Sequence, residues 1–206
     1  MAIVVEHEKR KQRILKIALD VFVEEGFENA TYQKIADRCR ITRTTLYLYF
    51  RNRREIFNYS IKQLMTDVEK DILGVKEDHR LSCPEKLKKT LSLILNRLEE
   101  NKRLLSVILD YLFSLSRTAG SGTLSGEKAG ADTRVRRRTI RLRHILTHMV
   151  IEGIKAGQLK KIDVGTADDL LYALLESAFF RLAVLKRDSA PELKDAVDLT
   201  VNQLSR

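Results

Sequence analysis

Apolar residues recur at helical spacing along most of the chain. Ile14, Ala18 and Phe22 follow one another at intervals of four, which predicts an amphipathic helix over about residues 8–25. Gly26 tolerates the left-handed conformation found at helix ends, and Phe27 is expected to fold back onto that helix. The pattern favours an all-α fold.

Two shorter helices are predicted next. Thr31 and Thr42 each stand before a short amphipathic stretch and have the hydroxyl of an N-cap residue. Three short helices joined by tight turns form a helix-turn-helix module. Its predicted core consists of Leu15, Ala18, Phe22, Phe27, Ile35, Ala36, Leu46 and Phe50.

The remaining apolar stripes predict longer helices, so the chain should contain about nine in total. They cover about residues 53–76, 84–98, 102–117, 132–156, 166–187 and 191–205. Four glycines between residues 120 and 130 predict a flexible loop. The only two prolines and nine glycines supply too few turn residues for a sheet-rich fold.

Composition narrows the class of protein. An apolar content of 44% excludes a wholly disordered chain, and the longest apolar run, residues 170–175, is far short of the ~20 residues of a membrane span. Met1–Val5 is too short for a signal-peptide core. Two cysteines cannot form a disulfide framework, so we expect a protein of the reducing cytoplasm with no membrane association.

The net charge of +10 is unevenly distributed and indicates anionic partners. Residues 134–161 carry a net charge of +8, and residues 1–59 carry +4. The arginines of segment 134–143 could attract an acidic ligand or form a solvated helix start, and the sequence leaves both open.

Residues 35–50 read Ile-Ala-Asp-Arg-Cys-Arg-Ile-Thr-Arg-Thr-Thr-Leu-Tyr-Leu-Tyr-Phe. This stretch resembles the DNA-binding signature of the TetR/AcrR transcriptional regulators, and the resemblance extends over roughly residues 10–57. The residues in register before and after the stretch are Phe22, Gly26, Phe27, Thr31, Asn52, Arg53, Glu55 and Ile56.

The resemblance implies a helix-turn-helix DNA-binding domain at 1–57 and a helical ligand-binding and dimerisation domain at 58–206. It further implies a homodimeric, ligand-responsive repressor that binds a pseudo-palindromic operator. The partners expected are therefore double-stranded operator DNA, an unidentified small-molecule effector and a second copy of the chain.

A recognition helix enters the major groove by its N-terminal end, which here reads Thr42-Arg43-Thr44-Thr45. Arg43 has the length and donors to read guanine, and the threonines suit a thymine methyl or a phosphate. Tyr47 is expected to contact DNA backbone or base. Tyr49 and Thr31 are expected to contact phosphate.

Two further positions carry an arginine where the family usually has another residue. By resemblance, Arg53 stands where the family has a phosphate-contacting lysine. Arg40 replaces the usual glycine before the recognition helix, and a non-glycine residue in a left-handed turn costs on the order of 1–2 kcal/mol.

The last two helices have wide apolar faces that suit an intersubunit four-helix bundle, although such faces also form ordinary core. The predicted dimer interface consists of Leu171, Leu174, Leu175, Ala178, Phe179, Leu182, Val201 and Leu204. Predicted effector contacts, each of which could instead be core, are Met65, Tyr111, His148, Met149 and Tyr172.

Neither a metal or cofactor site nor an enzymatic site is expected. His144, His148 and Glu152 share one helical face, but they do not form the His-Glu-x-x-His pattern, so no metal or cofactor is predicted. The sequence has no nucleophile elbow and no phosphate-binding glycine loop, which argues against an enzyme. A basic membrane-surface protein or a small-molecule-processing helical protein remains the alternative.

Overall fold

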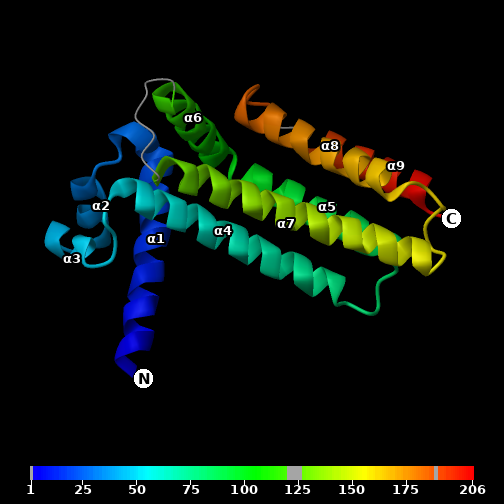
Figure 1. The fold of residues 1–206 in the computed structure, drawn as a ribbon, viewed down its shortest axis with the longest axis horizontal. Helices are drawn as coiled ribbons and strands as arrows, with labels where there is room; N and C mark the ends of the chain where they lie inside the picture. Colours follow the sequence, from blue (N-terminus) through cyan, green and yellow to red (C-terminus); the bar gives the residue numbers. More distant parts are fainter. Residues whose placement is uncertain (1, 120–126, 188–189) are drawn as a thin grey trace. The chain divides into compact units, whose positions relative to one another are not determined.

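A computed structural model of the protein describes residues 2–119, 127–187 and 190–206, and these contain nine helices and no β-strand (Figure 1). The predicted all-α fold is confirmed. The helices are α1 (Ala2–Asn29), α2 (Tyr32–Cys39), α3 (Arg43–Tyr47), α4 (Arg53–Lys76), α5 (Cys83–Glu100), α6 (Lys102–Ala119), α7 (Glu127–Lys155), α8 (Val164–Ala183) and α9 (Ala190–Leu204).

The chain divides into two compact units. The first comprises Met1–Thr66 and Val107–Val135, and the second comprises Asp67–Ser106 and Arg136–Arg206. The sequence was expected to divide after residue 57. The first unit extends further because Tyr111 of α6 packs on the rings of Phe27 and Phe57, with ring centroids 4.5 and 5.0 Å apart.

In the first unit, α2 packs against α1 and α3 packs against α2 (Figure 1). Gly26 has a φ of 77° and kinks α1, after which one more turn continues to Asn29. Phe27 turns back onto Phe22, with ring centroids 5.8 Å apart. All eight predicted core residues of this module are buried: Leu15, Ala18, Phe22, Phe27, Ile35, Ala36, Leu46 and Phe50.

The turn between α2 and α3 keeps its left-handed residue although that residue is an arginine. Arg40 has φ 56° and ψ 45°. Its N–H donates to the carbonyl of Asp37 at 3.0 Å, and the N–H of Ile41 donates to the carbonyl of Ala36 at 3.1 Å. These bonds satisfy the carbonyls at the end of α2, so the turn that directs α3 is intact.

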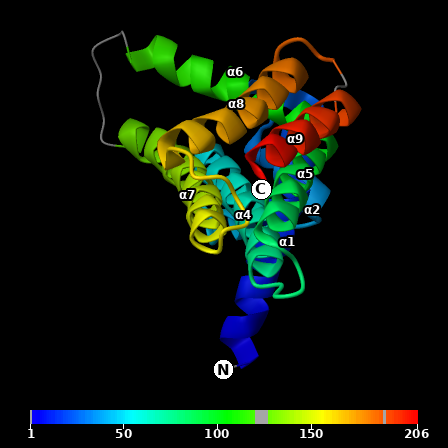
Figure 2. The ribbon, with the colours of Figure 1, turned by 90° about the vertical axis from the view of Figure 1, so that its right-hand side faces the viewer.

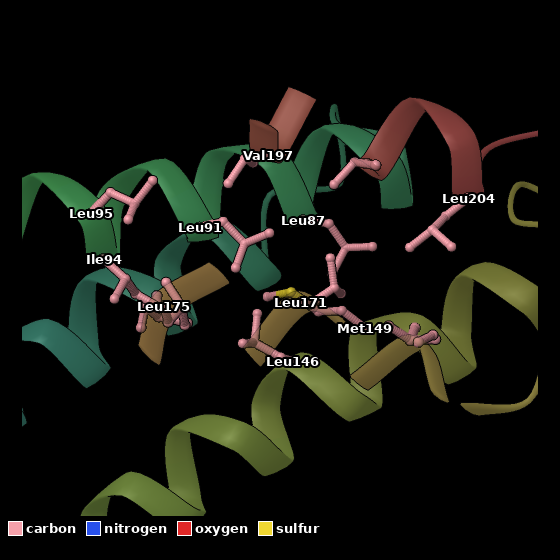
Figure 3. Close-up of a cluster of buried hydrophobic side chains, with 14 of the residues drawn as sticks. Leu87, Leu91, Ile94, Leu95, Leu146, Met149, Leu171, Leu175, Val197 and Leu204 are labelled. Carbon is pink, nitrogen blue, oxygen red and sulfur yellow. The ribbon is translucent and has the colours of Figure 1, made fainter. Parts of the chain in front are cut away.

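The second unit is built around α5, α8 and α9, which pack against one another (Figure 2). Ser82 and Glu85 form a capping box at the start of α5, and Pro84 occupies its first turn as predicted. Figure 3 shows leucines and other apolar side chains of α5, α7, α8 and α9 pointing toward one another. Those at the centre are Leu87, Leu91, Leu146, Met149, Leu171, Leu175 and Val197.

A polar contact also joins α7 to α8 within this unit. Asp168 is buried and accepts hydrogen bonds from Arg143 Nε at 2.5 Å and from Thr147 Oγ1 at 2.8 Å. Arg143 also pairs with the neighbouring Asp169. A buried carboxylate is tolerated when it is paired and hydrogen-bonded in this way, and the bonds fix the register of the two helices.

Several helix ends differ from the predicted ones. Helix α1 begins at Ala2 rather than near residue 8, and α7 begins at Glu127, so residues 127–130 are helical rather than loop. The rest of the predicted glycine loop, 120–126, lies outside the described residues. Asp163 caps α8, and its Oδ2 accepts from the N–H of Thr166 at 2.8 Å. None of the described helices has the length and hydropathy needed to cross a bilayer.

Replacing Arg40 tests the strain in the turn between α2 and α3. We expect Arg40→Gly to raise the free energy of unfolding by about 1 kcal/mol, because glycine adopts the left-handed conformation without a steric penalty. Arg40→Ala is the control, since it removes the same charge and keeps the Cβ. Denaturant unfolding of the three proteins checks this, and equal stabilities of the two variants would show that the turn is unstrained.

Candidate DNA-binding site

Thr42 and Thr45 hold the first turn of α3 together. The Oγ1 of Thr42 accepts from the N–H of Thr45 at 3.1 Å, and the two hydroxyls are 2.8 Å apart. The predicted N-cap is therefore confirmed. Both residues were also predicted to contact DNA, but here their hydroxyls bond to each other, and that of Thr42 also accepts from the helix backbone. Thr44 is exposed beside them.

Arg43 and Tyr47 form the exposed face of α3, one turn apart. The Nη2 of Arg43 donates to the hydroxyl of Tyr47 at 3.0 Å, and the guanidinium carbon lies 5.6 Å from the centre of the Tyr47 ring. Tyr47 is 48% exposed. Among the ion pairs of the described residues none includes Arg43, so no carboxylate in that part of the chain neutralises its charge.

Tyr47 rests on Tyr32, the first residue of α2. The two rings are stacked with centroids 4.5 Å apart and an angle of 19° between their planes. The hydroxyl of Tyr32 donates to the carbonyl of Phe50 at 2.5 Å. Burial, and to a smaller extent the neighbouring Tyr47, raise the pKa of Tyr32 to about 12, so this phenol stays protonated as a donor at any physiological pH.

Tyr49 and Thr31 complete the surface around α3. The ring of Tyr49 stacks on His7 of α1, with centroids 4.5 Å apart. Thr31 is exposed, and its Oγ1 accepts from the N–H of Lys34 at 3.2 Å as the N-cap of α2. Both residues lie on the same unit as α3, as the predicted phosphate contacts require.

Arg53, the expected phosphate contact, has a partner within the chain. Its guanidinium donates to the carbonyl of Glu28, pairs with the Glu28 carboxylate at 2.6 Å and covers the Phe27 ring at 4.8 Å. In the free protein Arg53 therefore braces the start of α4 against the end of α1. A phosphate contact requires it to exchange Glu28 for DNA.

The cations of α2 are also paired with carboxylates of α1. Lys34 lies 2.6 Å from Glu25, and Arg38 lies 2.6 Å from Glu24. The hydrogen bond from Arg38 lowers the pKa of Glu24. These exposed pairs contribute little stability, but they neutralise the charges of Lys34 and Arg38.

The predicted effector residues are divided between the two units. Met65 and Tyr111 lie in the first unit, and Tyr111 is buried among aromatic rings, which raises the pKa of its phenol. The other three lie in the second unit, where Met149 is buried in the core, His148 is exposed and Tyr172 is half-buried beside Arg143.

The predicted dimer residues lie mostly in the core of the chain itself. The buried ones are Leu171, Leu175, Ala178, Leu182, Val201 and Leu204, and Leu174 and Phe179 are partly buried. They face inward because α8 and α9 pack on α5, so a partner could reach the six only by opening the core. The large apolar residues that these helices expose are Leu170, Phe180 and Leu199, and Val184 and Leu185 are exposed just beyond the end of α8.

The two histidines of α7 do not assemble a metal centre in the part of the chain that is described. The Nδ1 of His148 lies 3.1 Å from Glu152 Oε1. No group of three or more histidine, cysteine or carboxylate side chains is placed to hold a metal ion among the described residues.

Three residues that support the site were missed at the sequence level: Tyr32, Glu28 and His7. Tyr32 is a tyrosine at a buried helical position, and this signal alone could have suggested a polar role. The pairings of Glu28 with Arg53 and of His7 with Tyr49 join residues far apart in the sequence, so no local pattern reveals them.

Helices α2 and α3, joined by a short turn with a left-handed residue, form a helix-turn-helix unit. Residues 14–59 match the family described as bacterial regulatory proteins, tetR family. The segment that contains the helix-turn-helix unit is therefore the part of this chain that matches the tetR family.

Three relatives show how far the similarity extends. An HTH-type transcriptional regulator of Staphylococcus aureus is 32% identical over 48% of this chain and 54% of its own length, so the chain spans about half of that relative. The fatty acid metabolism regulator protein of Bacillus subtilis is 28% identical over 62% of this chain and 76% of that protein. The crystal structure of the transcriptional regulator FadR from Bacillus subtilis, in complex with stearoyl-CoA, has a TM-score of 0.68 at 21% identity and covers 93% of this chain and 97% of that one.

Substituting Glu28 separates the two roles of Arg53. Glu28→Gln removes the charge that holds the guanidinium, and we expect affinity for any DNA duplex to rise several-fold at low salt. The log–log salt slope should steepen by roughly 0.9 for each additional phosphate that the protein neutralises. Fluorescence anisotropy with a random-sequence duplex at several salt concentrations measures both.

Glu24→Gln is the matched control, because it removes one negative charge from the same helix and releases Arg38 instead. An equal rise in both variants would mean that total charge alone is responsible. If Glu28→Gln does not raise the affinity for DNA, Arg53 only joins the start of α4 to the end of α1.

Proposed function

We propose that this protein is a DNA-binding transcriptional regulator that acts as a homodimer and responds to a small-molecule effector. The observation that carries the proposal is the outer face of α3. It presents Arg43, unpaired with any described carboxylate, together with Thr44 and Tyr47, on a helix whose inner residue Leu46 is fully buried. The protein acts in the cytoplasm, where DNA is accessible.

The proposed reading of DNA follows from the chemistry of this face. The first turn of α3 enters the major groove, where Arg43 donates two hydrogen bonds to O6 and N7 of a guanine. The bond to Tyr47 uses only part of the guanidinium, so further N–H groups remain for the base. Thr44 contacts a thymine methyl or a phosphate. Tyr49 and Thr31 donate to phosphates on either side, which positions the helix without reading sequence.

The proposed dimer uses the exposed faces of α8 and α9. Leu199 is 63% exposed and Phe180 is 52% exposed, and such side chains gain from burial against a second copy. A symmetric pair presents two copies of α3, so the operator is a pseudo-palindrome with half-sites about one helical turn or more apart. A dimer on a promoter blocks access of the transcription machinery, which makes the protein a repressor.

The proposed effector is a long-chain acyl thioester. Support comes from the relative named for fatty acid metabolism and from the similar fold solved with stearoyl-CoA. Helices α4 and α6 each contribute residues to both units. An effector bound in the second unit can therefore change the DNA-binding unit through these helices, provided that it favours one of two dimer arrangements.

Selection of bound duplexes from a random pool tests the function. We expect one pseudo-palindromic sequence with a guanine at the position read by Arg43. Arg43→Ala should weaken binding to that operator by about 1–3 kcal/mol per half-site and leave binding to scrambled DNA nearly unchanged. Equal weakening on both duplexes would mean that Arg43 is no base reader. If the selection enriches no sequence from the pool, the proposed function is contradicted.

A charge on the exposed face of α8 or α9 tests the dimer. We expect Phe180→Glu and Leu199→Glu to shift the protein toward monomer in sedimentation velocity, because a buried unpaired carboxylate is costly. Leu73→Glu on α4 is the control, since Leu73 is also exposed. Unchanged dimers in both variants would place the interface elsewhere.

Acyl thioesters can be tested directly on the complex with operator DNA. Stearoyl-CoA should raise the melting temperature of the protein and weaken operator binding, while free CoA, which lacks the acyl chain, should do neither. Melting curves and anisotropy titrations measure the two effects. The same response to both compounds, or to neither, would exclude this class of effector.

A further inference from the structure

Helix α3 is too short to hold its own geometry. It has five residues, and an isolated helix of that length does not form in water. Leu46 fixes its inner side in the core of the first unit. A buried inner residue fixes the position of the helix, but it does not fix the rotamers of the side chains on the outer face.

Tyr32 contacts α3 from α2 in two ways. Its ring stacks on the ring of Tyr47, and its hydroxyl bonds to the carbonyl of Phe50 beyond the end of α3. The ring contact limits where Tyr47 can point, and the hydrogen bond ties the segment that follows α3 to α2. Tyr32 is 9% exposed, so both contacts are shielded from water, where such a bond is stronger.

Tyr47 in turn holds Arg43. An exposed arginine has many rotamers, and ordering it on DNA costs conformational entropy. The hydrogen bond of 3.0 Å to the Tyr47 hydroxyl and the position of the guanidinium beside the ring restrict those rotamers before DNA is bound. A continuous set of contacts therefore leads from Tyr32 through Tyr47 to the side chain at the base edge.

We propose that Tyr32 is a positioning residue that sets the sequence specificity of this protein, by holding Tyr47 and through it Arg43 in the orientation that reads a base. This inference rests on the proposed function. Tyr32 itself does not touch DNA. Loss of Tyr32 therefore lowers the discrimination between operator and other sequences, because the base contact depends on the orientation of Arg43.

An ordinary core role would have a different signature. Loss of a core side chain lowers the stability of the module and weakens binding to every duplex alike. Loss of a positioning residue lowers the ratio of affinities for operator and scrambled DNA, since only the base contact depends on the orientation of Arg43.

The experiment compares single variants on the selected operator and on a scrambled duplex. Tyr32→Leu removes the ring and the hydroxyl, and we expect the specificity ratio to fall roughly tenfold per half-site, part of what a bidentate arginine contact supplies. Tyr32→Phe keeps the stacking and loses the bond to Phe50, so its ratio should lie between those of Tyr32→Leu and the native protein. Tyr59→Leu, a half-buried tyrosine of α4 in the same unit, is the control and should keep the native ratio.

A double-mutant cycle shows whether Tyr32 acts through Arg43. In the Arg43→Ala background, Tyr32→Leu should change the ratio no further. An equal fall in both backgrounds would overturn the proposal, and so would native ratios in Tyr32→Leu and Tyr32→Phe. Circular dichroism melting curves establish that each variant is folded at the assay temperature. If Tyr32→Leu is unfolded, Tyr32→Phe and Tyr47→Phe replace it in the cycle with Arg43→Ala.

The proposed function fails in a different way from this inference. If the native protein has the same affinity for the selected and scrambled duplexes, the DNA-binding function itself is wrong. If the native protein discriminates between them and the Tyr32 variants discriminate equally well, only the role of Tyr32 is wrong.

Discussion

The packing of α3 on α2 is the constraint on which the rest of the site depends. The five residues of α3 have too few internal hydrogen bonds to remain helical alone, so neighbouring residues must supply its order. Thr42 caps its first turn, Leu46 anchors it in the core, and Tyr32 stacks on its last residue. The left-handed Arg40 sets the direction in which the helix leaves the turn. Together these contacts hold α3 in place, so its outer face stays exposed and ordered.

The distribution of charge in the first unit follows the same logic. Carboxylates of α1 pair with Lys34 and Arg38 on α2 and with Arg53 on α4. Each exposed pair is worth little for stability, but together they neutralise these three cations of the unit. Arg43 lies outside these pairs and bonds to a neutral tyrosine, so its charge remains available to an anionic or electronegative partner.

The sequence predicted the helices, the caps and the module core because those depend on local spacing and residue type. Thr31, Thr42 and Gly26 act as their positions indicate, since capping and left-handed turns involve only a few consecutive residues. It did not predict which face of α8 is buried. That helix is apolar on most of its surface, so periodicity cannot tell Leu171, which packs on α5, from Leu170, which is exposed. A local pattern also cannot predict contacts between residues far apart in the sequence, such as Glu28 with Arg53.

The most direct test of the account is nuclear magnetic resonance of the labelled protein titrated with its selected operator duplex. The central claim is that the ordered outer face of α3 meets DNA. Amide and side-chain shifts should therefore change most at residues 42–49 and at Thr31, and the Arg43 guanidinium resonance should sharpen on binding. Changes confined to the segment 134–161, with residues 42–49 unaffected, would contradict the account and assign nucleic-acid binding to the basic part of α7.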